Sequence, residues 1–168
     1  GESKPTFVTV ITSRALSVGE YVKINSEEGE ILGLVERSSV SSAAFADVKN
    51  FDEAMESIEI AGLNKRDKTF TAHIGILGFL GNLRKGQSII PAIPPIPGTE
   101  ITQPSKQDLE EIFSPKNDGW VKIGSLLRNK TIDAKVNLDK IVSRHLGILA
   151  MTGMGKSNLV SLIKKQLG

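Results

Sequence analysis

Residues 21–35 read YVKINSEEGEILGLV, and this stretch decides the fold. Apolar and polar side chains alternate at 21–24, and a second apolar run follows at 31–35. Between them stands Glu27-Glu28-Gly29, which is typical of a turn because glycine adopts backbone conformations closed to other residues. The stretch therefore predicts two short β-strands joined by a turn.

Other short segments rich in β-branched side chains surround this pair, with glycines between them. The strands expected from them are residues 7–11, 70–76 and 88–90. Five short strands at close spacing predict a mainly β fold with a small closed or partly open β-barrel over residues 1–100. Residues 51–60 interrupt the pattern with the apolar spacing of a helix whose other face is acidic.

A proline-rich stretch, PAIPPIPGTEI at residues 91–101, ends the barrel region. Proline cannot donate to a sheet ladder and keeps its neighbour out of the helical region, so we expect a stiff, extended exit. A proline-rich ligand for a partner domain is the alternative interpretation. Ser105 with Asp108 three residues later predicts a capped helix that ends near Phe113. Residues 101–118 are thus expected to be a linker with a short helix.

Composition excludes several classes of site. The chain has 168 residues, no cysteine and two histidines, which excludes disulfides, thiolate metal sites, a cysteine nucleophile and a histidine-rich metal cage. The sequence contains no apolar run of about 18 residues, so we expect no membrane partner. The first residues lack the pattern of a signal peptide, and the expected localisation is cytoplasmic.

Charge is unevenly distributed along the chain. The first 60 residues carry 5 basic and 11 acidic side chains, and the remainder carries 16 basic and 8 acidic ones. A solvated surface is the simplest explanation of the basic part, and a nucleic-acid surface is the alternative.

The last 24 residues contain the motif that indicates a chemical function. After expected strands at 120–123 and 132–136, Leu146 to Leu149 form an apolar run expected of a strand buried on both faces. AMTGMGKS at 150–157 follows and leads into a helical pattern. It matches the phosphate-loop pattern G-x-x-x-x-G-K-[ST], with Ala150 in place of the first glycine.

Each residue type in this motif suits phosphate binding. Gly153 and Gly155 permit the backbone conformations in which successive N–H groups wrap a phosphate chain. The following helix directs its positive N-terminus at the same anion. Lys156 would place a charge on the β- and γ-phosphates, and the hydroxyl of Ser157 would bind Mg²⁺. A glycine turn before an ordinary helix is the structural alternative.

The segment HLGILAMTGMGKSN, residues 145–158, resembles the nucleotide loop of the HerA-like ATPases in the HerA–FtsK superfamily. Further segments resemble the HAS barrel that opens archaeal HerA proteins and its junction to their motor. They are GEYVKI (19–24), ILGLVERSSV (31–40), the acidic helix near 51–59, PPIPGTEI (94–101) and WVKIGSLL (120–127). The resemblance covers essentially the whole chain.

This resemblance implies a HAS β-barrel over residues 1–100 and a truncated N-terminal part of a RecA-like ATPase domain over 119–168. The implied function is the oligomerisation and nuclease-docking part of a hexameric, ATP-driven translocase of double-stranded DNA. Such motors act with a NurA-type nuclease in DNA end resection and double-strand-break repair. Two alternatives stay open, namely the barrel and phosphate loop of a rotary-type ATPase subunit, and a stand-alone nucleotide-binding module.

The resemblance also assigns the site. The residues implied to bind ATP are Thr152, Gly153, Met154, Gly155, Lys156, Ser157 and Asn158, with Ser157 as the Mg²⁺ ligand. Lys156 and Arg144 are the catalytic candidates. Arg144 would approach the nucleotide of a neighbouring subunit, and a surface or interface salt bridge is its alternative role. Because 11 residues follow Ser157, the family's acidic motif and later arginine are missing, and the chain alone is expected to be inactive.

Overall fold

The structure is a computed structural model that describes residues 4–42, 68–143, 147–151 and 153–167. Its internal contacts divide the chain into two units, residues 1–104 and 105–168. The helix predicted at 51–60 lies outside the described residues.

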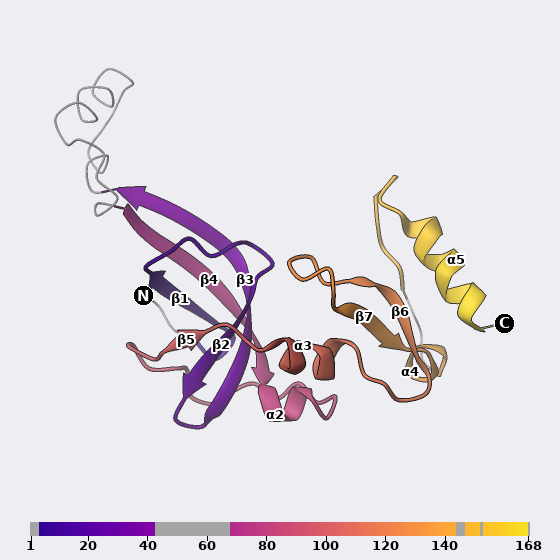
Figure 1. Ribbon diagram of the computed structural model, residues 1–168, viewed down its shortest axis with the longest axis horizontal. Coiled ribbons are helices and arrows are strands. Elements are labelled where there is room, and N and C mark those ends of the chain that lie inside the picture. Colours follow the sequence, from indigo (N-terminus) through magenta and orange to yellow (C-terminus); the bar gives the residue numbers. More distant parts are fainter. Residues whose placement is uncertain (1–3, 43–67, 144–146, 152, 168) are drawn as a thin grey trace, which may run out of the picture. The chain divides into compact units, whose positions relative to one another are not determined.

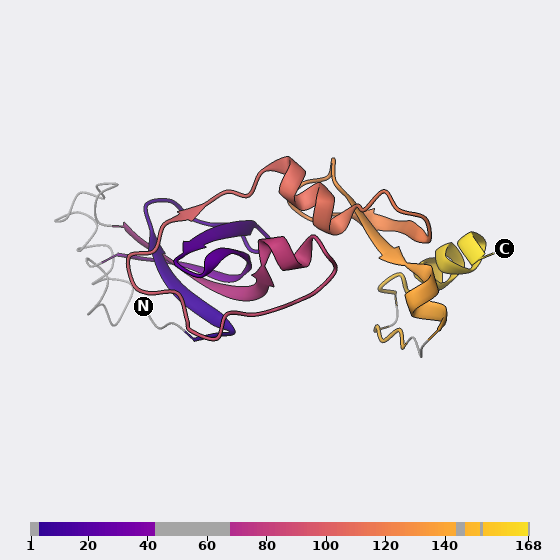
Figure 2. The same ribbon diagram turned by 90° about the horizontal axis from the view of Figure 1, so that it is seen from below.

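Unit 1 is an antiparallel sheet of five strands. They are β1 (Phe7–Thr12), β2 (Tyr21–Ser26), β3 (Gly29–Ser42), β4 (Lys68–Phe79) and β5 (Ile101–Thr102). The strand order is β1-β4-β3-β2-β5. The strands curl into a half-barrel, and β1 and β5 are its two edges (Figures 1 and 2). The predicted mainly β fold with a partly open barrel is confirmed.

The β2–β3 hairpin follows the pattern predicted from residues 21–35. Ser26 pairs with Gly29, so Glu27 and Glu28 alone form the turn. Gly29 has φ +137°, a conformation that side chains disfavour, and the Ser26 hydroxyl donates to its carbonyl at 2.7 Å. The turn fixes the register, which places Ile24 opposite Ile31.

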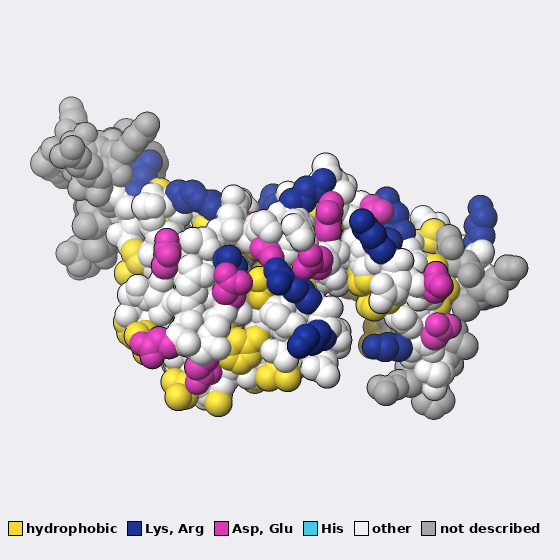
Figure 3. Space-filling view, turned by 60° about the horizontal axis from the view of Figure 1, so that its bottom comes forward, with side chains coloured by type: hydrophobic (Ala, Val, Ile, Leu, Met, Phe, Trp, Pro, Cys, Tyr) yellow, Lys and Arg dark blue, Asp and Glu magenta, His cyan; other side chains and the backbone are white. Residues whose placement is uncertain are grey.

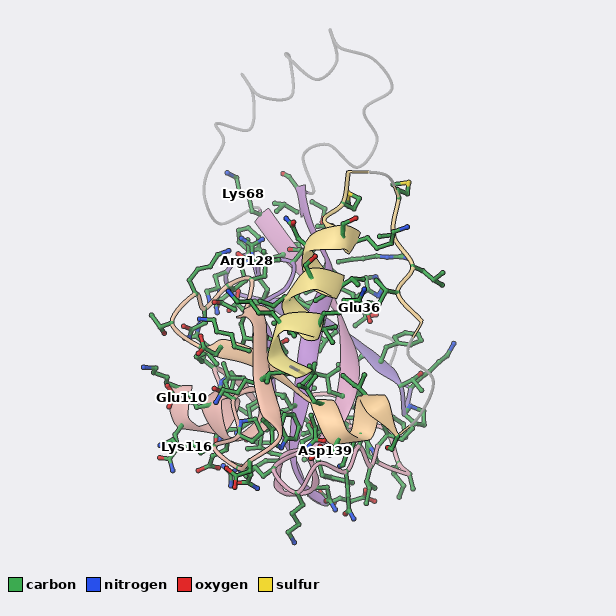
Figure 4. The ribbon with its side chains drawn as sticks, turned by 90° about the vertical axis from the view of Figure 1, so that its right-hand side faces the viewer. Glu36, Lys68, Glu110, Lys116, Arg128 and Asp139 are labelled. Atoms are coloured by element: carbon green, nitrogen blue, oxygen red, sulfur yellow. The ribbon has the colours of Figure 1, made fainter. Side chains whose placement is uncertain are left out.

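The core of unit 1 lies on the concave side of the curled sheet. Its buried members are Val8, Leu16, Val22, Ile24, Ile31, Val35, Ala72, Ile74 and Ile76. Gly33 makes room for this packing, because a Cβ at Gly33 would collide with the side chain of Ile74. On β4, a Cβ at Gly75 would likewise meet the carboxylate of Glu36, which is labelled in Figure 4.

The prediction of a strand at 88–90 is wrong, because these residues form no strand. The chain leaves β4 through the short helix α2 (Leu80–Leu83) and returns beside the end of β4. There Phe79 N donates to Ile89 O at 2.9 Å. Gly78 has φ +140° and leaves no room for a side chain beside the Ile89 backbone. Pro91 follows and cannot donate to a ladder, so the contact does not extend into a strand.

A charged cluster joins the loop after β1 to the start of β2. Arg14 Nη2 contacts Glu20 Oε1 at 2.6 Å, and Ser17 N donates to Glu20 Oε2 at 3.0 Å. The Arg14 guanidinium holds the pKa of the Glu20 carboxyl below its ordinary value, and the Gln103 side chain adds to this effect. Since Gln103 directly follows β5, Glu20 bridges residues next to both edge strands.

Unit 2 contains the elements α3 (Lys106–Phe113), β6 (Trp120–Ser125), β7 (Asp133–Asn137), α4 (Leu138–Val142) and α5 (Lys156–Leu167). The predicted capped helix is confirmed as α3. Asp108 N donates to Ser105 Oγ at 3.1 Å, and Ser105 N donates to Asp108 Oδ2 at 2.9 Å. This reciprocal pair satisfies two N–H groups that a helix start otherwise leaves without partners.

The strands predicted at 120–123 and 132–136 form the antiparallel hairpin β6–β7. Lys122 of β6 and Asp133 of β7 form a salt bridge of 2.6 Å. Five residues in the described part of the unit are buried, namely Asp108, Leu109, Leu126, Ile132 and Leu138. Trp120 at the start of β6 is half-buried. In the described part of the chain no helix combines the length and apolar character that a membrane crossing requires.

Candidate functional site

The predicted phosphate loop lies between α4 and α5 in unit 2. Residues 147–151 run without regular structure, the turn at 153–155 follows, and α5 begins at Lys156. Helix α5 packs against β6 (Figure 1). The loop therefore leads into a helix that contacts the β6–β7 hairpin through β6.

Both glycines of the loop have the backbone conformation that the motif requires. Gly153 has φ +84° and Gly155 has φ +80°. Residues with a side chain rarely adopt such angles, so the local backbone conformation explains why both positions are glycine. A Cβ at either position would meet no atom within 4 Å, which leaves space beside the loop for a ligand.

The start of α5 presents backbone donors at the same place. Leu159 N donates to Gly155 O at 3.0 Å, which is the first hydrogen bond of the helix. The N–H groups of Lys156, Ser157 and Asn158 come before this bond and have no acceptor within the helix. Together with the positive end of the helix dipole, they suit an anion such as a phosphate.

The side chains of Lys156, Ser157 and Asn158 are exposed. The ammonium of Lys156 and the hydroxyl of Ser157 are therefore accessible at the helix start. Met154 contributes differently, because its N–H already donates to Met151 O at 3.2 Å within the loop. The residues fit a phosphate group, and among the described residues of the loop Ser157 offers a hydroxyl for Mg²⁺.

The strand predicted at 146–149 is not present in its described part, residues 147–149. Leu149 is 97% exposed. A strand buried on both faces needs a neighbouring strand on each side, and β6 and β7 pair with each other instead. The apolar residues Leu159, Val160, Leu162 and Ile163 of α5 are accordingly only half-buried.

The structure brings Gly153 to Asn158 together in one turn and the first residues of a helix. Thr152 and Arg144, the other two predicted site residues, lie outside the described residues, as does His145. The second histidine, His73, lies on β4, where its Nδ1 is 3.1 Å from Thr9 Oγ1 on β1.

Sequence reasoning missed a feature of unit 1. Two cavities of about 300 and 410 Å³ lie between β1 and β5, the open side of the half-barrel. Both are lined by Ile11, Thr99 and Ile101. Hydrophobic side chains are exposed on this unit (Figure 3), among them Ile11 at 69% and Ile96 at 58%. The uncharged sequence FVTVIT of β1 was the available signal, but only the strand order shows that β1 is an edge.

Comparison with known proteins connects both units to one family. Residues 121–168, which contain all but the first residue of β6 together with β7, α4, the loop and α5, match the family model for the central domain of helicase HerA. A probable helicase of Methanocaldococcus jannaschii is 34% identical over 99% of this chain and 32% of the relative. The double-strand break repair helicase HerA of Saccharolobus solfataricus is 29% identical over 99% of this chain and 32% of the relative.

A third relative, HerA of Pyrococcus furiosus, is 32% identical over 91% of this chain and 27% of the relative. The class to which these matches point is that of DNA helicases. Because the similarity extends over nearly the whole chain, the chain belongs to the HerA helicase family. It spans about a third of the length of the curated relatives it matches.

Proposed function

We propose that this chain supplies the barrel and the phosphate loop of a hexameric, ATP-driven translocase of double-stranded DNA in end resection and double-strand-break repair. The observation that carries the proposal is the loop itself, with Gly153 and Gly155 at positive φ directly before the N-terminus of α5. The helicase relatives favour this function over a rotary-type ATPase subunit or a stand-alone nucleotide-binding module.

In this proposal residues 152–158 hold the phosphates of ATP. The N–H groups at the start of α5 donate hydrogen bonds to the anion, and Lys156 balances charge on the β- and γ-phosphates. Mg²⁺ would lower the charge of the same phosphates, with Ser157 as one ligand. Arg144 would act on the nucleotide of a neighbouring subunit in the ring.

The proposed role of unit 1 is to join subunits and to dock a NurA-type nuclease. Its support is the exposed apolar surface, since clustered apolar side chains on a surface often mark protein interfaces. Ile93 and Ile96 of the proline-rich segment belong to this surface, and a small cavity beside them is also lined by Glu27 and Glu28.

The docking role predicts that the 168-residue chain alone retains the nuclease. A tagged chain should co-purify with a NurA-type nuclease, and Lys156→Ala should retain the same amount, because this substitution lies in the other unit. Retention is measured by pull-down with purified proteins. A nuclease that binds only when the rest of the motor is present would contradict the docking role of unit 1.

A further inference from the structure

Besides β5, the sheet of unit 1 has two strand edges that pair with no described strand. Strand β1 pairs with β4 on one side and has no strand on the other. Strand β3 is longer than its neighbour β2. The pairing with β2 ends at Leu34 of β3, opposite Tyr21. Residues 19 and 20 continue this contact at Val35. From Arg37 to Ser42, β3 pairs only with β4 within the described ranges (Figure 1).

The peptide groups of β1 show which bonds its edge offers. Ile76 N donates to Thr6 O at 2.9 Å, so the carbonyl of Thr6 points toward β4. Residues opposite one another in an antiparallel pair alternate between bonded and non-bonded positions. The peptide groups of Thr9 and Ile11 consequently point away from β4, toward the open side of the half-barrel.

The same alternation applies to β3. Ala72 of β4 is opposite both Val10 of β1 and Ser38 of β3. Its peptide group bonds to β1, so the groups of β4 that face β3 are those of Thr71 and His73. The peptide groups of Ser38 and Val40 therefore point outward from the arm formed by β3 and β4, whose outer end is at Lys68 (Figure 4).

These two edges lie on opposite sides of one three-stranded segment, and they are directionally compatible. Both β1 and β3 are antiparallel to β4, so they run parallel to each other. A rotation about an axis along the strands would place β1 of one copy beside β3 of the next. Repeating the rotation adds further copies in the same way, and such a head-to-tail contact forms a ring when the rotation divides a full turn.

We propose that residues 37–42 of β3 add as a strand to the β1 edge of a second copy of this chain, forming a parallel, head-to-tail sheet contact. The inference rests on the proposed ring and specifies the surface that would join its subunits. It concerns unit 1 alone.

The sequences of the two edges support this occupant. Soluble proteins protect exposed edges with charges, prolines or bulges. Strand β1, FVTVIT, has none of these residues, and the free part of β3, RSSVSS, has one arginine. Apart from the charge of Arg37 and the irregularity between Val35 and Arg37, the two edges are unprotected. Each is six residues long, and we expect them to pair in the assembled protein.

Space and apolar contact agree with strand addition. The cavities between β1 and β5 run along β1 and beyond it to Arg14, so the β1 edge borders open space. Val40 is 56% exposed on β3. It is opposite Phe70 on the side of the sheet that carries Ala72, and Val10 of β1 lies on that same side. Pairing would therefore bring Val40 of one copy to the concave side near Val10 or Thr12 of the next.

Cysteine cross-linking tests this contact, because the chain contains no cysteine. Ile11 and Ser39 are both register partners of Thr71, so they lie at the same level and on the same face of the sheet. The double variant Ile11→Cys/Ser39→Cys, treated with a short bismaleimide, should give a ladder of covalent oligomers on a denaturing gel. A mixture of the two single variants should give covalent dimers. Each single variant alone should run as a monomer on the denaturing gel.

The matched control is Ile11→Cys/Lys116→Cys, in which the second cysteine is exposed in unit 2 and should give no ladder. Dimers from Ile11→Cys alone would indicate a two-fold contact between β1 edges and would overturn the proposal. Absence of a ladder from the Ile11/Ser39 double variant would overturn it as well.

A proline variant provides a second readout. Ile11→Pro removes an N–H that points away from β4, so the β1–β4 ladder stays intact while the added strand loses a donor. Sedimentation velocity should show weaker self-association, with circular dichroism confirming the fold. Self-association without the cross-linked ladder would refute the edge contact and leave the proposed ring standing. Failure of the unmodified chain to self-associate at all would count against both.

Discussion

Replacing Lys156 by alanine should lower ATP hydrolysis at least about 100-fold in a protein that carries this chain together with the rest of the HerA motor. Lys156 is the first residue of α5, is exposed, and directly follows Gly155 at φ +80°. It would supply a positive charge where the γ-phosphate gains negative charge as the bond breaks. Phosphate release at saturating ATP is the measurement.

Lys164→Ala is the matched control, because Lys164 is an exposed lysine in the last turn of the same helix. This variant should hydrolyse ATP at the rate of the unsubstituted protein. Equal activity of Lys156→Ala and Lys164→Ala would remove the phosphate-loop assignment.

Replacing Ile74 by alanine should lower the free energy of unfolding of unit 1 by about 2–5 kcal/mol. Ile74 is 0% exposed, lies in β4 between β1 and β3, and belongs to the core cluster. Its side chain fills the space left by the missing Cβ of Gly33. Removal of three carbons would leave a cavity between β3 and β4 in addition to the lost hydrophobic burial.

Urea unfolding followed by far-ultraviolet circular dichroism checks this loss. Ile90→Ala is the control at a side chain of the same type that is 45% exposed, and its effect should be much smaller. A loss for Ile74→Ala no larger than that for Ile90→Ala would show that the described core does not hold the half-barrel together.

The elements that the sequence predicted well have local causes. The β2–β3 hairpin is determined by alternation on both sides of a two-residue turn, and Gly29, which directly follows the turn, has a positive φ that glycine permits. The start of α3 is determined by Ser105 and Asp108, which lie three residues apart and bond to each other. The positive φ angles of Gly153 and Gly155 also have a local cause, because glycine at these two positions permits them.

The elements that the sequence predicted wrongly depend on distant partners. Residues 147–149 have the composition of a buried strand, but a strand forms only where another strand pairs with it, and β6 and β7 pair with each other. Ser88 to Ile90 meet the end of β4 at Gly78, and Pro91 prevents the contact from extending. Periodicity shows which secondary structure a segment prefers, but it does not show which other segment it pairs with.

The open side of the half-barrel could not be predicted for a similar reason. Which strands are edges follows from the order β1-β4-β3-β2-β5, in which β1 lies beside a strand that begins 56 residues after β1 ends. The residues that line the cavities come from both ends of unit 1, from Val8 to Gln103. The sequence of each segment does not show that the two segments lie beside the same open space.

The most direct test of the proposed function is the dependence of ATP hydrolysis on DNA. Phosphate release is measured for the protein that carries this chain with the rest of the motor, without DNA and with linear double-stranded DNA, and with Lys156→Ala as the blank. A motor that translocates on duplex DNA couples hydrolysis to that DNA, so the account predicts that the duplex raises the rate and that the blank shows no rise. A rate that is unchanged by duplex DNA would contradict it.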